Sequence, residues 1–118
     1  MYSPELLDHF EHPRNSGELP GADLHVQIQN PACGDILELS AKIGDGHIEE
    51  IRFRAKGCVP AIACASAVTQ LAGGRSVQEA RAIGKDDIVR AVGSLPPASG
   101  HAAQLALDAL QAMLKMAA

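Results

Sequence analysis

Four side chains with metal-binding chemistry lie at the edges of predicted helices and strands. Cys33 and Asp35 are separated by one residue, in a connection between two predicted strands. Cys58 lies where a third strand gives way to a helix, and His101 follows a Leu-Pro-Pro turn at the start of the last predicted helix. Two thiols, a carboxylate and an imidazole form a ligand set for a thiophilic metal or an iron–sulfur cluster.

Cys33 and Asp35 also have ordinary structural explanations. A free cysteine is among the most frequently buried residues, and aspartate often forms hydrogen bonds in turns. However, Pro31 and Gly34 place Cys33 in a connection rather than inside a strand. Asp35 would be costly to bury without a partner. The pattern therefore leaves ligation and a purely structural role open for this pair.

The other two cysteines differ in their positions. Cys58 follows Gly57 at a predicted helix start, where backbone N–H groups favour anions, so we expect a stabilised thiolate that can bind a metal or react. Cys64 lies inside the same helix between Ala63 and Ala65, about 120° around the axis from Cys58 at about 100° per residue. We therefore expect Cys64 to be buried and not to share a metal with Cys58.

The chain has five histidines, so a histidine alone is weak evidence for a ligand. His9 and His12 fall on the first predicted helix and are expected to be exposed. His101 differs because it follows a rigid Pro-Pro turn at the start of a helix, a location that positions functional side chains well. An ordinary histidine at a helix start is the alternative for this residue.

Hydrophobic periodicity predicts an α+β fold. Apolar and polar residues alternate, as in half-buried strands, over Leu24–Ile28, Leu37–Ile43 and Ile51–Ala55. Helices are predicted from Pro4 to before Pro13, over Pro60–Leu71, from the capping box at Ser76, over Lys85–Val92 and from Ser99 to the end. Consecutive strands followed by helices predict a small three-stranded antiparallel sheet with helices packed on one face. We expect residues 1–118 to form a single domain.

Composition excludes several classes of function. The formal net charge of −4 and the absence of basic runs argue against nucleic acid as a partner. The apolar stretches are too short to cross a bilayer, and no charged-then-apolar leader opens the chain, so neither a membrane nor a secreted location is expected. Three cysteines do not suggest a disulfide framework, and reduced thiols fit the cytoplasm.

These residues together resemble the IscU/NifU N-terminal iron–sulfur cluster scaffolds. The likeness covers nearly the whole chain. Four motifs occur in the order found in that family: Asp8-His9-Phe10 with Pro13-Arg14-Asn15, Pro31-Ala32-Cys33-Gly34-Asp35, Gly57-Cys58 with Ala61-Ile62-Ala63, and Leu95-Pro96-Pro97 with His101. The resemblance implies the family's α+β fold, with a cluster site at one exposed end.

The resemblance also implies a function. Cys33, Asp35, Cys58 and His101 would bind iron or a [2Fe–2S] cluster, with zinc possible in the resting state. The protein would be a scaffold or carrier rather than an enzyme, and its partners would be a cysteine desulfurase and recipient apo-proteins. The family has a third cysteine directly after the histidine, which is the usual acceptor of persulfide sulfur, and Ala102 occupies that position here.

Two other functions remain open. In the family, Val-Lys follows the Leu-Pro-Pro turn, whereas Ala98-Ser99 follows it here. A diverged adaptor with the scaffold fold would dock on a desulfurase or another partner without building a cluster, and the departures from the family at Ala102 and Ser99 favour it. A sulfur relay would carry persulfide on Cys33 or Cys58. The oligomeric state and the recipient proteins are not predicted.

Overall fold

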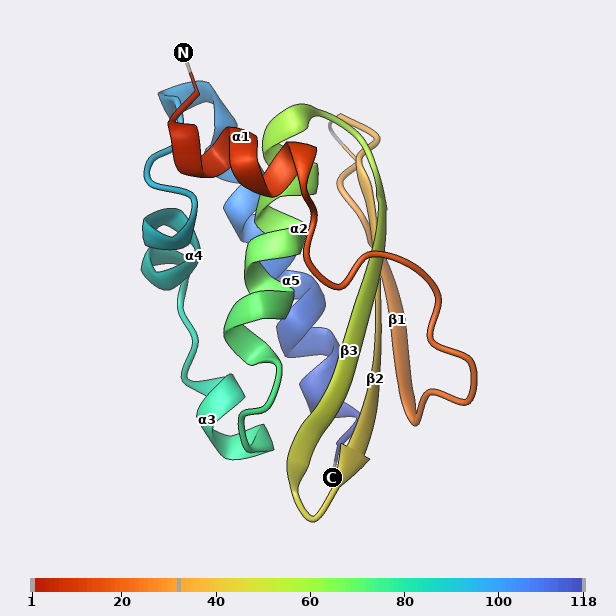
Figure 1. Cartoon of the computed structure of the whole chain (residues 1–118). Helices are drawn as coiled ribbons and strands as arrows, with labels where there is room; N and C mark the ends of the chain where they lie inside the picture. Colours follow the sequence, from red (N-terminus) through yellow and green to blue (C-terminus); the bar gives the residue numbers. More distant parts are fainter. Residues whose placement is uncertain (1, 32, 118) are drawn as a thin grey trace.

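The computed structural model describes residues 2–31 and 33–117. Over these residues the chain forms an antiparallel sheet with helices packed against one face (Figure 1). The strands are β1 (Leu24–Gln29), β2 (Ile36–Gly44) and β3 (His47–Lys56). The helices are α1 (Pro4–Glu11), α2 (Val59–Ala72), α3 (Val77–Arg81), α4 (Lys85–Ala91), the short 3₁₀ helix η1 (Pro97–Ser99) and α5 (Gly100–Lys115). The predicted α+β fold with a three-stranded antiparallel sheet is confirmed.

The sheet is a simple meander in the order β1-β2-β3. Its inner face carries alternate apolar residues of β2 and β3, and the pairs Leu37–Ala55 and Leu39–Phe53 lie opposite one another across the two strands. Because side chains alternate between the faces of a sheet, this register buries one face and leaves the other to polar residues. The outer face accordingly carries charged pairs, among them Glu38 opposite Arg54.

Helices α2 and α5 pack directly on the sheet, and α2 also contacts α1 and α4 on its other side. Helix α2 packs against β3, α5 and α1, and small residues dominate its buried positions: Ala61, Ala63, Cys64, Ala65, Ser66, Ala67 and Ala72. Alanine side chains allow a helix to approach its neighbours closely, which explains how α2 can be buried on nearly all sides. The close packing brings the first turns of α2 and α5 to the same end of the molecule as the β1–β2 loop (Figure 1).

Helix α1 is attached to α2 by a buried polar contact. His9 Nδ1 lies 2.8 Å from Ser66 Oγ, and that oxygen also accepts a hydrogen bond from the Arg14 N–H at 2.8 Å. The hydroxyl proton is therefore available for His9, and a neutral imidazole accepts it. The prediction of an exposed His9 is wrong, because only 5% of the residue is exposed. The sequence of α1 alone does not reveal Ser66, the distant serine whose hydroxyl makes burial of a histidine possible.

The burial of His9 predicts that stability falls at mildly acidic pH. Burial, followed by the charge of Arg14, lowers the pKa of His9 below its usual 6.5. The unfolded chain therefore binds a proton on His9 at a pH where the folded chain does not. Stability is complete above about pH 6.5 and is lost as the pH falls towards the lowered pKa, with a slope of at most about 1.4 kcal/mol per pH unit.

Urea unfolding between pH 7.5 and 5 measures this effect. His9→Asn, which keeps a hydrogen-bonding group near the Nδ1 position, should reduce the dependence on pH. His12→Asn is the matched control, because His12 is exposed at the end of the same helix. An unchanged slope in His9→Asn would show that another group causes the loss.

Candidate metal centre

Cys33 is presented by a tight loop between β1 and β2. The Gly34 N–H donates to the Asn30 carbonyl, and the Asn30 N–H donates to the Asp35 carbonyl, both at 2.8 Å. Gly34 has φ +76°, a backbone conformation that glycine adopts without strain. These bonds close the loop and leave Cys33 exposed on it. The sequence prediction that Cys33 lies in a connection rather than a strand is confirmed.

Asp35 is the buried member of the group. It directly precedes β2, and only 6% of the residue is exposed. The Cys58 thiol lies 3.3 Å from Asp35 Oδ2, at hydrogen-bonding distance, and His101 Nε2 lies 3.8 Å from the same oxygen. A buried carboxylate is costly unless it has partners, and Asp35 has two that can also bind metals.

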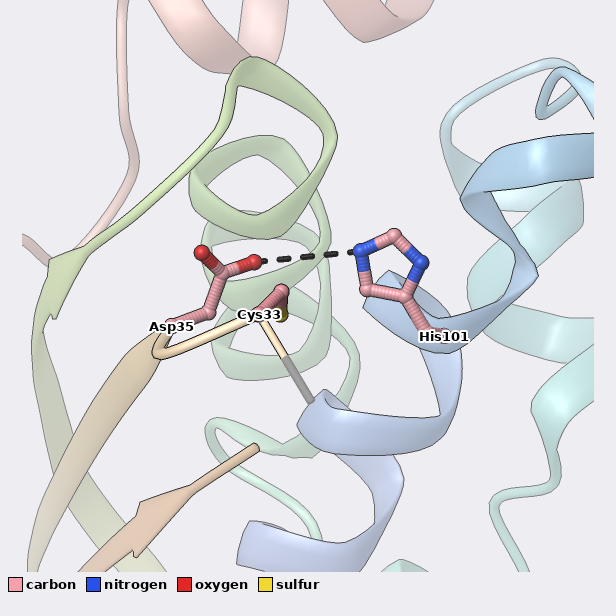
Figure 2. A group of neighbouring side chains, drawn as sticks. All are labelled: Cys33, Asp35 and His101. Carbon is pink, nitrogen blue, oxygen red and sulfur yellow. Dashed lines mark ion pairs between the residues drawn. The ribbon is translucent and has the colours of Figure 1, made fainter. Parts of the chain in front are cut away.

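His101 is the second residue of α5 and follows the turn formed by η1. The Ser99 N–H donates to the Pro96 carbonyl at 2.8 Å, which fixes the chain just before the helix. Figure 2 shows the imidazole of His101 and the carboxylate of Asp35 pointing toward one another, with Cys33 beside them. One ligand atom from each of Cys33, Asp35 and His101 lies within 4.8 Å of the other two.

Cys58 forms the N-cap of α2 and joins this group through Asp35. Partial burial of the thiol raises its pKa, and the hydrogen bond and negative charge of Asp35 act in the same direction. The Ala61 N–H at the helix start lowers the pKa, as the sequence predicted, but the other effects are larger. The prediction of a stabilised thiolate is therefore wrong, because it considered the helix start without the burial and the neighbouring carboxylate.

Cys64 and Ala102 both lie in the core. Cys64 is fully buried, and burial raises the pKa of its thiol to about 12, so it is protonated at neutral pH. The prediction that Cys64 is buried is confirmed. That it shares no metal with Cys58 stays a prediction. Ala102 lies in the first turn of α5 and is 1% exposed, so the methyl group at this position faces the interior.

The structure also reveals a contributor that the sequence analysis missed. Gly57 precedes Cys58 and lies against the Asp35 carboxylate, with no side chain between them. The strand pairing indicates this contact. Ile36 pairs with Lys56, so one further step of the antiparallel register brings Asp35 opposite Gly57.

The arrangement provides two sulfur donors, one nitrogen and one oxygen at one end of the molecule. Thiolates and imidazole bind iron and zinc, and histidine can replace cysteine on an iron of a [2Fe–2S] cluster. A carboxylate adds a harder oxygen ligand. The donor set therefore fits a metal or a small cluster, and ligation by Cys33, Asp35, Cys58 and His101 remains a prediction.

Comparison with known proteins gives the same family from several directions. The family described as NifU-like N terminal domain matches residues 1–117. The iron-sulfur cluster assembly scaffold protein IscU 1 of Archaeoglobus fulgidus is 41% identical over 111 residues, which cover 94% of this chain and 72% of that protein. IscU of Escherichia coli (strain K12) is 42% identical over 117 residues, covering 96% of this chain and 91% of that protein.

Other matches are larger or more distant. The bifunctional protein NifU/MnmA of Rubrobacter xylanophilus is 43% identical over 111 residues, which cover 92% of this chain but only 23% of that protein. The crystal structure of a scaffold protein assigned to the SUF system of Fervidobacterium islandicum has a TM-score of 0.81 and covers 96% of both chains. At 18% identity, that structure supports the fold alone.

The different environments of Cys58 and Cys64 lead to a prediction about metal content. Cys58→Ala should remove most of the bound zinc or iron, because it deletes a sulfur donor next to Asp35. Cys64→Ala should leave metal content nearly unchanged and lower the free energy of unfolding by about 1 kcal/mol through lost core packing. Elemental analysis of protein purified without oxygen tests this. Equal losses of metal in both variants would make Cys64 a ligand.

Proposed function

The chain belongs to the family of NifU-like N-terminal domains, and on this premise we propose that it is a scaffold for iron–sulfur cluster assembly. The observation that carries the proposal is the meeting of Cys33, Asp35 and His101 within 4.8 Å, with the Cys58 thiol 3.3 Å from the same carboxylate. Such a set is unusual for a purely structural role, because a structural carboxylate does not need three metal-binding neighbours.

Each residue would make a distinct contribution to the cargo. The thiolates of Cys33 and Cys58 would bind the iron of a [2Fe–2S] cluster, and His101 would add a nitrogen ligand. Asp35 would bind less tightly than a thiolate, because a carboxylate oxygen is a hard donor. A weak fourth ligand suits a protein that must hand its cluster on. The role is to hold and transfer, so we propose no catalytic residue, and we propose zinc as an occupant of the same ligands at rest.

The expected partners follow from this role. Cluster assembly requires a source of sulfur, so we propose that a cysteine desulfurase and recipient apo-proteins are the partners.

No helix among residues 2–31 and 33–117 is long and apolar enough to cross a membrane. Three free cysteines, two of them exposed, support a cytoplasmic location, where thiols remain reduced. We also propose that residues 1–118 act as one domain, which the match over residues 1–117 supports.

The alanine at position 102 leaves two other functions open. In the family the residue after the histidine is the usual sulfur acceptor, and a methyl group cannot carry persulfide. A sulfur relay on Cys33 or Cys58 would bypass this position, because both thiols are exposed. An adaptor that binds a desulfurase without building a cluster would not need the acceptor at all.

Anaerobic reconstitution with ferrous iron, a cysteine desulfurase and excess cysteine, whose thiols supply the electrons that reduce persulfide sulfur to sulfide, separates these functions. A scaffold should develop visible cluster absorbance with about one sulfide per iron, the ratio in a [2Fe–2S] cluster. Cys33→Ser and Cys58→Ser should lose most of this absorbance, because each removes a thiolate. Persulfide without iron would support the relay, and the absence of both would support the adaptor.

Ala102 provides a second test of the function. Ala102→Cys should increase both persulfide uptake and cluster yield several-fold over the wild-type chain, because it restores a thiol at the family's sulfur-acceptor position, directly after His101 in the sequence. Ala103→Cys is a matched control: the residue is also buried, but it lies about 100° further around α5. Mass spectrometry after persulfide labelling measures uptake, and thermal unfolding shows whether the added sulfur fits the core.

If the wild-type chain takes up sulfur as fast as Ala102→Cys, the methyl group at this position is no defect. Cys33 or Cys58 would then be the acceptor.

A further inference from the structure

Gly57 lies at the point where the sheet meets the proposed site. It follows β3 directly and precedes Cys58, the N-cap of α2. The last pair between β2 and β3 is Ile36 with Lys56, so Asp35 and Gly57 are the next residues to face each other. Both continue the inner face of the sheet, which is the face that the helices cover.

The Asp35 carboxylate fills the space that a side chain at position 57 would occupy. A β-carbon built on Gly57 would lie 2.5 Å from Asp35 Oδ1, 2.6 Å from its Cγ and 3.0 Å from its Cβ. Distances under 3.0 Å do not occur for real β-carbons, so any larger residue must displace the carboxylate or the backbone. The short Asp35 side chain cannot avoid the clash by a small rotation, because its own β-carbon is also close.

Glycine is not needed at position 57 for its backbone freedom. The glycines with positive φ are Gly17, Gly21, Gly34, Gly46, Gly74 and Gly93, and Gly57 is not one of them. Residue 57 is therefore not in the left-handed region that favours glycine. The reason for glycine here is the space it leaves beside Asp35.

We propose that Gly57 is a positioning residue that seats the Asp35 carboxylate between Cys58 and His101. This inference rests on the proposed function, and it adds a determinant of how firmly the site holds its metal. The same oxygen, Oδ2, lies 3.3 Å from Cys58 Sγ and 3.8 Å from His101 Nε2. Cys58 is not in the group of three within 4.8 Å, so Asp35 is the residue that links the two parts of the site.

A displaced carboxylate would lose both contacts at once. Cys58 would then lose its hydrogen-bond acceptor, and the oxygen ligand would move away from Cys33 and His101. Gly57→Ala should therefore act on metal binding through Asp35 and not through the fold in general. The effect should disappear when Asp35 is itself removed.

A double-mutant cycle with zinc as the probe tests the proposal. Zinc affinity is measured by competition with a chromophoric chelator for wild type, Gly57→Ala, Asp35→Ala and the double variant. We expect Gly57→Ala to bind zinc about 10–100-fold more weakly, the range typical for residues that orient a metal ligand. Asp35→Ala should show a similar loss, and the double variant should bind no more weakly than Asp35→Ala alone.

Gly100→Ala is the matched control. It also adds one methyl group next to a proposed ligand, His101, but a β-carbon on Gly100 would meet only Lys85 Nζ, at 3.8 Å. Its zinc affinity should equal that of wild type. Wild-type affinity in Gly57→Ala, or losses that add in the double variant, would overturn the proposal.

Thermal unfolding in the presence of a metal chelator provides a second measurement that does not depend on zinc. Gly57→Ala should lower the melting temperature in the Asp35 background and have little effect in the Asp35→Ala background, where the clash is absent. If Gly57→Ala fails to fold, the double variant should fold, and its failure would overturn the proposal. A wild-type chain that binds no metal but shows this pattern would refute the proposed function and leave the role of Gly57 intact.

Discussion

The close approach of α2 to the sheet and to α5 is the constraint on which the site depends. Alanines occupy most of the buried positions of α2, so the helix can contact β3 on one side and α5 on another. Both helices consequently begin at the same end of the sheet. Cys58 at the start of α2 and His101 in the first turn of α5 then flank the loop that carries Cys33. Larger residues along α2 would separate these helix starts.

Tight packing of this kind requires every buried polar group to have a partner. Among the described residues that are not exposed, no fully buried side-chain nitrogen or oxygen lacks a hydrogen bond. Thr69 donates to the Ser66 carbonyl at 2.7 Å, while Ser66 joins α1 to α2 through His9. Another buried polar group is the Asp35 carboxylate, and its neighbours Cys58 and His101 are side chains that can bind metals. Cys58 Sγ at 3.3 Å and His101 Nε2 at 3.8 Å keep Asp35 Oδ2 partnered in this structure.

Local patterns were enough to predict most of the fold. Strand alternation and the capping signals at Ser3 and Ser76 depend on neighbours in the sequence, and the structure has the expected strands and helices. The order of the motifs also indicated the residues that meet at the site. The errors all involve residues distant in sequence. Ser66 explains the burial of His9, and burial together with the nearby Asp35 raises the pKa of Cys58. The role of Gly57 required a strand register that no local pattern fixes.

The direction of α5 has a consequence for how this fold can be joined to others. The helix begins at the site and runs to Lys115 at the opposite end of the molecule, about 20 Å away at 1.5 Å per residue (Figure 1). Polypeptide that continued from this helix would emerge far from Cys33, Asp35, Cys58 and His101. A fused domain could therefore be tethered there without covering these four residues. The architecture therefore allows the domain to form one part of a longer chain. In the bifunctional relative from Rubrobacter xylanophilus, the matched segment makes up only 23% of the protein.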